Sequence, residues 1–145
     1  MTESIKQATT AGEATSILEL TSDNFTTSID DRPFAIVDFW APWCAPCRAF
    51  APVFAAAAAR HPDALFAKVN TEDQQAIAAQ FGIRSIPTLM IFRDNIIVFS
   101  EPGALSAGAL EQVLVAAKAL DMDEVRRSVE AQDSEGQSDS AAPAA

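Results

Sequence analysis

The chain has 145 residues, of which 49% are hydrophobic and 21% are charged, and its formal net charge is −10. This length and composition are typical of one globular domain that buries its core without help from disulfides or metal ions. A strongly acidic chain lacks the basic surface that nucleic acids require and is repelled by anionic lipids. We therefore expect neither nucleic acid nor a membrane as a partner.

The two ends of the chain differ in composition from its middle. Residues 1–16 are rich in Thr, Ser, Ala and Glu without a sustained apolar period, and we expect them to form a flexible N-terminal arm. Residues 132–145 are rich in Ser, Ala and acidic residues and predict a disordered tail. One domain is therefore expected over residues 17–131. No secretory signal and no apolar run long enough to span a membrane is visible in the sequence, which favours a cytoplasmic location.

Strand and helix patterns alternate through this domain and predict a mixed α/β fold. In chain order we expect a strand over residues 17–20, a helix over 25–29 capped by Thr21 or Ser22, a strand over 34–40, a helix over 46–60, a strand over 64–69, a helix over 73–81, strands over 88–92 and 96–100, and a helix that begins after Ser106. Residues 34–40 are nearly all apolar, which is typical of a central strand buried on both faces.

Two features near the end of the domain need separate mention. Asp94 and Asn95 lie between two apolar runs and indicate a hairpin turn, although glycine at the second position is the stronger signal. The apolar spacing of the last helix continues through Met122, Val125 and Val129, so this helix either extends or restarts there.

The two cysteines of the chain, Cys44 and Cys47, directly follow the predicted central strand. A disulfide between them closes too short a loop to stabilise a fold. At the start of the predicted helix, unpaired backbone N–H groups and the helix dipole favour the thiolate of Cys44, the nucleophile of thiol–disulfide exchange. Cys47 shares a helix face with Cys44 and can attack a mixed disulfide formed there. Pro46 suits the first helical turn, and Trp43 offers a flat apolar surface to a partner.

Other interpretations of this pair remain open at this point. The cysteines could be buried structural thiols or half of a zinc site, and a metal or iron–sulfur cluster could be shared between two chains. Zinc normally takes four ligands, and besides the cysteines only His61 is available, which we expect to be a solvated loop residue. We therefore expect a redox pair and no metal.

Three segments in matching order resemble the signatures of the thioredoxin family: residues 38–48 with Ala51 and Pro52, residues 82–89, and residues 103–106. The resemblance covers about residues 18–120. It implies the thioredoxin fold, in which a central mixed five-stranded β-sheet is flanked by four α-helices. It also implies a protein-disulfide reductase with a redox disulfide between Cys44 and Cys47.

The resemblance further implies roles for individual residues. Cys44 would attack the substrate, Cys47 would resolve the mixed disulfide, and Asp38 would be a buried acid/base that handles the Cys47 proton through a water molecule. A carboxylate buried on a central strand should have a raised pKa, although Asp38 could instead be a polar residue exposed at the strand end. Lys68 is either a tuning residue for Asp38 or an ordinary salt-bridge partner, and we expect Trp40 to support packing.

A docking surface for substrates is implied as well. Pro87 would follow a cis peptide bond, and the Ile86 backbone would pair with an extended substrate. The residues expected at this surface are Trp43, Ala45, Pro46, Ile86, Pro87, Gly103 and Ala104. Two departures from the family pattern bear on it: Ala45 replaces the usual glycine after the first cysteine, and Pro102 stands where a β-branched residue is common.

The implied partners are disulfide-containing proteins and a thioredoxin reductase. We expect a monomer without a bound cofactor, which receives electrons from NADPH through that reductase. The alternative function is a thioredoxin-fold binding or chaperone module that uses the same apolar face. An oxidase or isomerase of an oxidising compartment is disfavoured by Pro46 and by the lack of a visible export signal.

Overall fold

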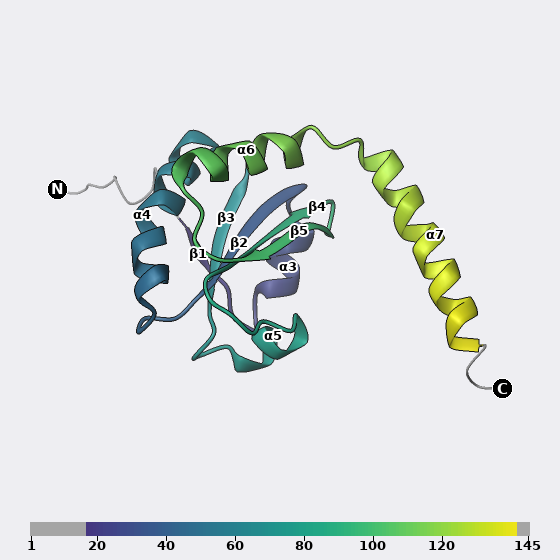
Figure 1. Ribbon diagram of the computed structural model, residues 1–145, viewed down its shortest axis with the longest axis horizontal. Helices are drawn as coiled ribbons and strands as arrows, with labels where there is room; N and C mark the ends of the chain where they lie inside the picture. Colours follow the sequence, from purple (N-terminus) through teal and green to yellow (C-terminus); the bar gives the residue numbers. More distant parts are fainter. Residues whose placement is uncertain (1–16, 142–145) are drawn as a thin grey trace.

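The computed structural model describes the backbone of residues 17–141 and the side chains of residues 17–132 (Figure 1). The strands are β1 (Leu18–Glu19), β2 (Phe34–Trp40), β3 (Leu65–Asn70), β4 (Thr88–Arg93) and β5 (Ile96–Pro102). The helices are α3 (Phe25–Asp30), α4 (Ala45–Arg60), α5 (Gln75–Gln80), α6 (Ala107–Lys118) and α7 (Met122–Ala141). The elements expected from the sequence are all present, and the last helix ends at Lys118 and restarts as α7, one of the two outcomes expected from its apolar spacing. None of the helices in the described residues has the length and apolar character needed to cross a membrane.

The five strands form one mixed sheet in the order β1-β3-β2-β4-β5. β3 runs parallel to both β1 and β2, whereas β4 is antiparallel to β2 and β5. β2 is the central strand, so its Asp38 pairs with Lys68 of β3 on one side and with Leu89 of β4 on the other. The sheet therefore carries a carboxylate in the middle of its most buried strand.

Helices cover both faces of this sheet (Figure 1). One face packs against α4 and α6 in a cluster that includes Phe34, Ile36, Phe50, Phe54, Leu110 and Leu114. The other face packs against α3 and α5 in a cluster that includes Ile29, Ala35, Val37, Phe39 and Ile77. Because successive residues of a strand point to opposite faces, Asp38 and Trp40 lie on the same face as Ile36, toward α4.

The β4–β5 hairpin forms without glycine in its turn. Asp94 and Asn95 have positive φ angles of 51° and 67°, the left-handed conformation that Asp and Asn tolerate better than other side chains. Asn95 also donates a hydrogen bond to the Asp30 carboxylate at the end of α3, at 2.6 Å. The hairpin prediction is thus confirmed, and a side-chain contact supports the turn.

Helix α6 begins at Ser106, whose Oγ accepts the Ala109 N–H at 3.1 Å as the sequence predicts. The predicted cap of α3 is wrong in detail, because the N-cap position of that helix is Asn24. Thr21 instead accepts the Asp23 N–H in the turn before the helix, at 3.2 Å.

The chain restarts as α7, which projects away from the sheet (Figure 1). The buried side chain of Met122 and an ion pair between Arg126 and Asp94, at 3.1 Å, hold its first turns against the domain. Residues 132–141 are helical, which differs from the predicted disordered tail. No proline occurs between Met122 and Pro143 to end the helix, although Ser, Asp and Gly, which favour helix only weakly, make up six of residues 132–141. The expected N-terminal arm and residues 142–145 lie outside the described residues, so the proposed domain limits remain a prediction.

Candidate active site

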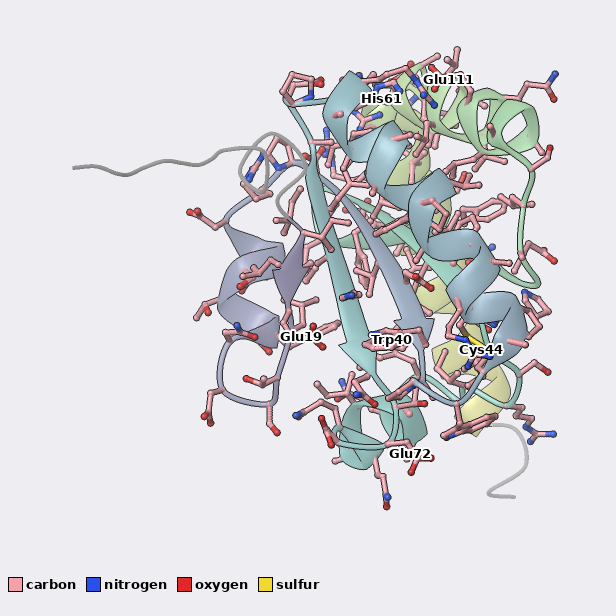
Figure 2. The ribbon with its side chains drawn as sticks, turned by 90° about the vertical axis from the view of Figure 1, so that its left-hand side faces the viewer. Glu19, Trp40, Cys44, His61, Glu72 and Glu111 are labelled. Carbon is pink, nitrogen blue, oxygen red and sulfur yellow. A yellow bond between two sulfur atoms is a disulfide. The ribbon has the colours of Figure 1, made fainter. Side chains whose placement is uncertain are left out.

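The two cysteines lie at the N-terminal end of α4 (Figure 2). Cys44 is the N-cap residue, in extended backbone conformation, and its Sγ accepts the Cys47 N–H at 3.2 Å. Cys44 and Cys47 form a disulfide, and both side chains are buried. Pro46 occupies the first turn, where the backbone N–H that it lacks would have no helical partner. The predicted placement of Cys44 at a helix N-terminus is confirmed.

A second loop meets the disulfide. The Ile86–Pro87 peptide bond is cis, as the resemblance implies, and the Ile86 carbonyl oxygen lies 3.6 Å from Cys44 Sγ. The Gly103 N–H donates to the Pro87 carbonyl at 2.7 Å, and Gly103 has a φ of 107°, which side-chain-bearing residues rarely adopt. These contacts bring the chain segments around residues 44, 86 and 103 together at the same end of the strands β2, β4 and β5.

The expected docking residues differ in exposure. Trp43, Ala45, Pro46, Gly103 and Ala104 are exposed, and Ile86 is half-buried. Pro87, however, is buried. Low exposure does not separate Pro87 from the cysteines, because Cys44 is buried as well and the Ile86 carbonyl just before Pro87 lies 3.6 Å from its sulfur. The role of Pro87 at the docking surface stays a prediction.

Trp43 is oriented by a residue that the sequence did not single out. This residue is 64% exposed, and its indole Nε1 donates to the Glu72 carboxylate at 3.0 Å. Glu72 follows the end of β3, and Trp40 at the end of β2 pairs in register with Asn70 at the end of β3. The parallel pairing of the two strands places their following loops side by side. A search for polar residues just after the neighbouring strand would have found Glu72.

Asp38 is buried, with only 3% of its surface exposed, so the interpretation as an exposed strand-end residue is excluded. Burial raises the pKa of Asp38 to about 7, and the positive charge of Lys68 opposes this increase. Its Oδ1 atom has no hydrogen-bond partner among the described residues. A carboxyl group with a pKa near neutrality can accept or donate a proton under physiological conditions.

A cavity of about 80 Å³ is lined by both Asp38 and Cys47. Its walls come from β2, β3, α4 and the residue before β1, and include Asp38, Trp40, Cys47, Lys68 and Ile17. The Lys68 ammonium lies 4.5 Å from the centre of the Trp40 ring, a cation–π contact. A larger hollow of about 300 Å³ lies between β5 and α6, but its lining contains neither cysteine and no titratable group.

The prediction for His61 is wrong. This residue is buried, stacks on Phe66, and its Nε2 lies 3.0 Å from the Glu111 carboxylate. Its Nδ1 lies 3.2 Å from the Lys118 ammonium. His61 caps the C-terminal end of α4, opposite the cysteines (Figure 2), and connects α4 to α6. No group of three or more potential metal ligands is found among the described side chains.

Comparisons with known proteins agree with this geometry. The thioredoxin family model matches residues 16–116. The chain is 52% identical over 115 residues to a putative thioredoxin 2 of Streptomyces coelicolor, covering 79% of this chain and 86% of that one. It is 43% identical over 102 residues to a thioredoxin of Porphyra purpurea, covering 68% and 94% of the two chains. A solved structure of a thioredoxin variant from Halobacterium salinarum NRC-1 matches with a TM-score of 0.68 at 28% identity, covering 74% of this chain and 96% of that chain. The chain therefore belongs to the thioredoxin family, and its Cys44–Cys47 pair makes it a thiol–disulfide oxidoreductase.

Proposed function

We propose that this protein works as a reductase that transfers two electrons from Cys44 and Cys47 to disulfides of substrate proteins. The observation that carries the proposal is the position of Cys44 at the N-cap of a sixteen-residue helix, with the Cys47 N–H directed at its sulfur. The Sγ atom that accepts this N–H would carry the negative charge in the reduced protein. Both the N–H group and the helix dipole stabilise that charge.

In the first step, the Cys44 thiolate attacks one sulfur of the substrate disulfide. A new bond forms between Cys44 and that sulfur, and the second substrate sulfur leaves as a thiolate that takes up a proton. Trp43, Pro46 and the Ile86 backbone would hold an extended substrate segment during this step.

In the second step, Cys47 resolves the mixed disulfide. The ionised carboxylate of Asp38 takes the Cys47 thiol proton through water in the shared cavity, and the Cys47 thiolate attacks Cys44 Sγ. The Cys44–Cys47 disulfide forms, and the remaining substrate sulfur leaves as a thiolate. Asp38 suits this task because its raised pKa, about 7, makes it a stronger base than a surface carboxylate.

Two electrons must then return to the disulfide. We propose that they come from NADPH through a thioredoxin reductase, and that the protein acts as a monomer in the cytoplasm. Dithiothreitol can replace the reductase in vitro, which separates the exchange reaction from the identity of its electron donor.

Insulin reduction tests the proposal. With dithiothreitol as electron donor, the protein should accelerate the precipitation of reduced insulin, and Cys44→Ser should abolish that acceleration. Ala56→Ser, an exposed position on the same helix, introduces the same side chain without removing a thiol and should keep full activity. No acceleration by the wild-type protein would refute the reductase function.

A binding role is the second candidate, because the indole ring of Trp43 is largely exposed beside the cysteines and fixed by Glu72. Exposed tryptophan is a frequent anchor at protein interfaces. A Cys44→Ser/Cys47→Ser double variant distinguishes the two roles. If it restores the phenotype of a strain that lacks the protein, binding is the main role; if it does not, the thiol chemistry is essential.

A further inference from the structure

Two buried polar atoms in the described side chains lack a hydrogen-bond partner, and both belong to residues that line the cavity behind Cys47. They are Asp38 Oδ1 and Trp40 Nε1. A buried N–H group or carboxyl oxygen without a partner is unfavourable, and in folded proteins such groups are normally satisfied by another residue or by water. Their shared cavity thus points to a common partner.

The cavity is large enough for that partner to be water. Its volume of about 80 Å³ exceeds the ~10–15 Å³ that a cavity needs to hold one water molecule. Asp38 and Trp40 are two residues apart on β2, so their side chains lie on the same face of the sheet. An indole N–H can only donate, whereas an ionised carboxylate oxygen can only accept. A water molecule can accept from the first and donate to the second.

We propose that Trp40 is a positioning residue that, with Asp38 Oδ1, holds the water molecule through which the Cys47 proton passes. The inference rests on the proposed reductase function and assigns to Trp40 a polar role beyond packing. The indole N–H fixes the water oxygen, so one water hydrogen points to Asp38 and the remaining lone pair can receive the Cys47 proton.

The Trp40 ring has a second effect in the same cavity. Its face lies under the Lys68 ammonium, at 4.5 Å from the ring centre. This contact holds the cation near Asp38, where its positive charge favours the ionised carboxylate. From α4, the titratable or charged residues that line the cavity are Cys47 and Arg48. From β1, Glu19 pairs in register with Lys68, and on the β4 side the residue opposite Asp38 is the uncharged Leu89.

The test is to titrate Asp38 in Trp40→Phe. Phenylalanine keeps an aromatic face for Lys68 but removes the N–H, so the water loses its orientation and the carboxylate loses stabilisation. The Asp38 pKa, followed by the carbon-13 chemical shift of its carboxyl group, should rise. The ratio of ionised to protonated Asp38 at pH 7 should fall by about three- to tenfold, because an increase of one in the pKa lowers this ratio tenfold. Trp40→Leu removes the ring as well and should raise the pKa further.

Phe92→Leu is the control for a general loss of packing. Phe92 is buried in the cluster on the opposite face of the sheet and does not line the cavity. This variant should titrate as the wild type does. An unchanged or lowered Asp38 pKa in Trp40→Phe would overturn the proposal, and so would an equal rise in Phe92→Leu.

A crystal structure provides the direct observation. It should contain a water molecule within hydrogen-bond distance of both Trp40 Nε1 and Asp38 Oδ1, and a well-ordered cavity without that water would refute the inference. Neither the titration nor the crystal structure uses a substrate. Their outcome is therefore independent of insulin reduction, and failure of the reductase proposal can be told apart from failure of this one.

Discussion

Replacing Asp38 by asparagine should stabilise the folded protein at neutral and alkaline pH. Asp38 is buried on the central strand, and its pKa of about 7 in the folded protein is far above the value of 3.8 expected for an unperturbed aspartate. At a pH between these two pKa values, Asp38 has released its proton in the unfolded chain but still holds it in the folded protein. Stability must therefore decrease as the pH rises through this interval. Asparagine has a similar volume and carries no charge at any pH.

The size of the effect follows from the difference between the two pKa values. They differ by about three, and a difference of one in pKa corresponds to about 1.4 kcal/mol. At pH 4 the folded wild type is neutral at this position and only its unfolded chain is partly ionised, so the free energies of unfolding of the wild type and the variant should agree to within about 1 kcal/mol. Above pH 7 the variant should be more stable by up to about 4 kcal/mol.

Urea unfolding of the oxidised protein at pH 4 and at pH 8.5 measures both quantities. The fluorescence of the two tryptophans or the circular dichroism of the helices follows the transition, and the midpoint should differ between variant and wild type only at the higher pH. The reasoning is refuted if Asp38→Asn is no more stable than the wild type at pH 8.5. It is equally refuted if the free energies of unfolding of the two proteins differ by the same amount at both pH values, because the difference in stability would then not come from ionisation of Asp38.

Three further substitutions test other parts of the structure. Lys68→Met should raise the Asp38 pKa above about 7, because the Lys68 charge lowers it; a carboxyl titration that does not move would show that Lys68 leaves Asp38 untouched. His61→Ala should lower the free energy of unfolding by about 2 kcal/mol, since it removes a buried ring and its contacts with Glu111 and Lys118; urea unfolding checks this, and a change below about 0.5 kcal/mol would contradict it. Asn95→Val should cost about 1–2 kcal/mol because a β-branched residue is strained at a φ of 67°, and an unchanged melting temperature would count against the observed turn.

Much of the fold could be predicted because local patterns and tertiary packing agree. The nearly continuous apolar run of residues 34–40 corresponds to β2, which is buried on both faces. The single carboxylate in that run, Asp38, is buried for the same reason, since its neighbours Val37 and Phe39 fix the strand in the core. Apolar spacing alone does not show where the last helix ends and α7 begins, but a local hydrogen-bonding residue does. The Asp121 carboxylate accepts the N–H groups of Asp123 and Glu124, at 3.0 and 3.3 Å.

The features that escaped prediction depend on residues far apart in the sequence. His61 is buried because α6 packs against the end of α4 and supplies Glu111, fifty residues later. Glu72 reaches Trp43 because β2 and β3 are neighbours. The cavity behind Cys47 exists only where Trp40, Lys68 and Ile17 meet, and its volume depends on how these side chains pack. No pattern within a single segment carries this information.

The position of Asp38 is hard to explain by stability alone. A neutral residue of similar size would fit the central strand, and burial of the carboxylate opposes folding at every pH where it is ionised. The same burial brings its pKa to about 7 and leaves one oxygen without a protein partner, facing the cavity that reaches Cys47. A group that weakens the fold and has a pKa suited to proton transfer next to the Cys47 sulfur fits the proposed acid/base role better than a structural one. The gain in stability of Asp38→Asn should therefore be accompanied by slower resolution of mixed disulfides at neutral pH, which single-turnover release of a trapped substrate measures. A variant that gained stability and resolved at the wild-type rate would remove this explanation.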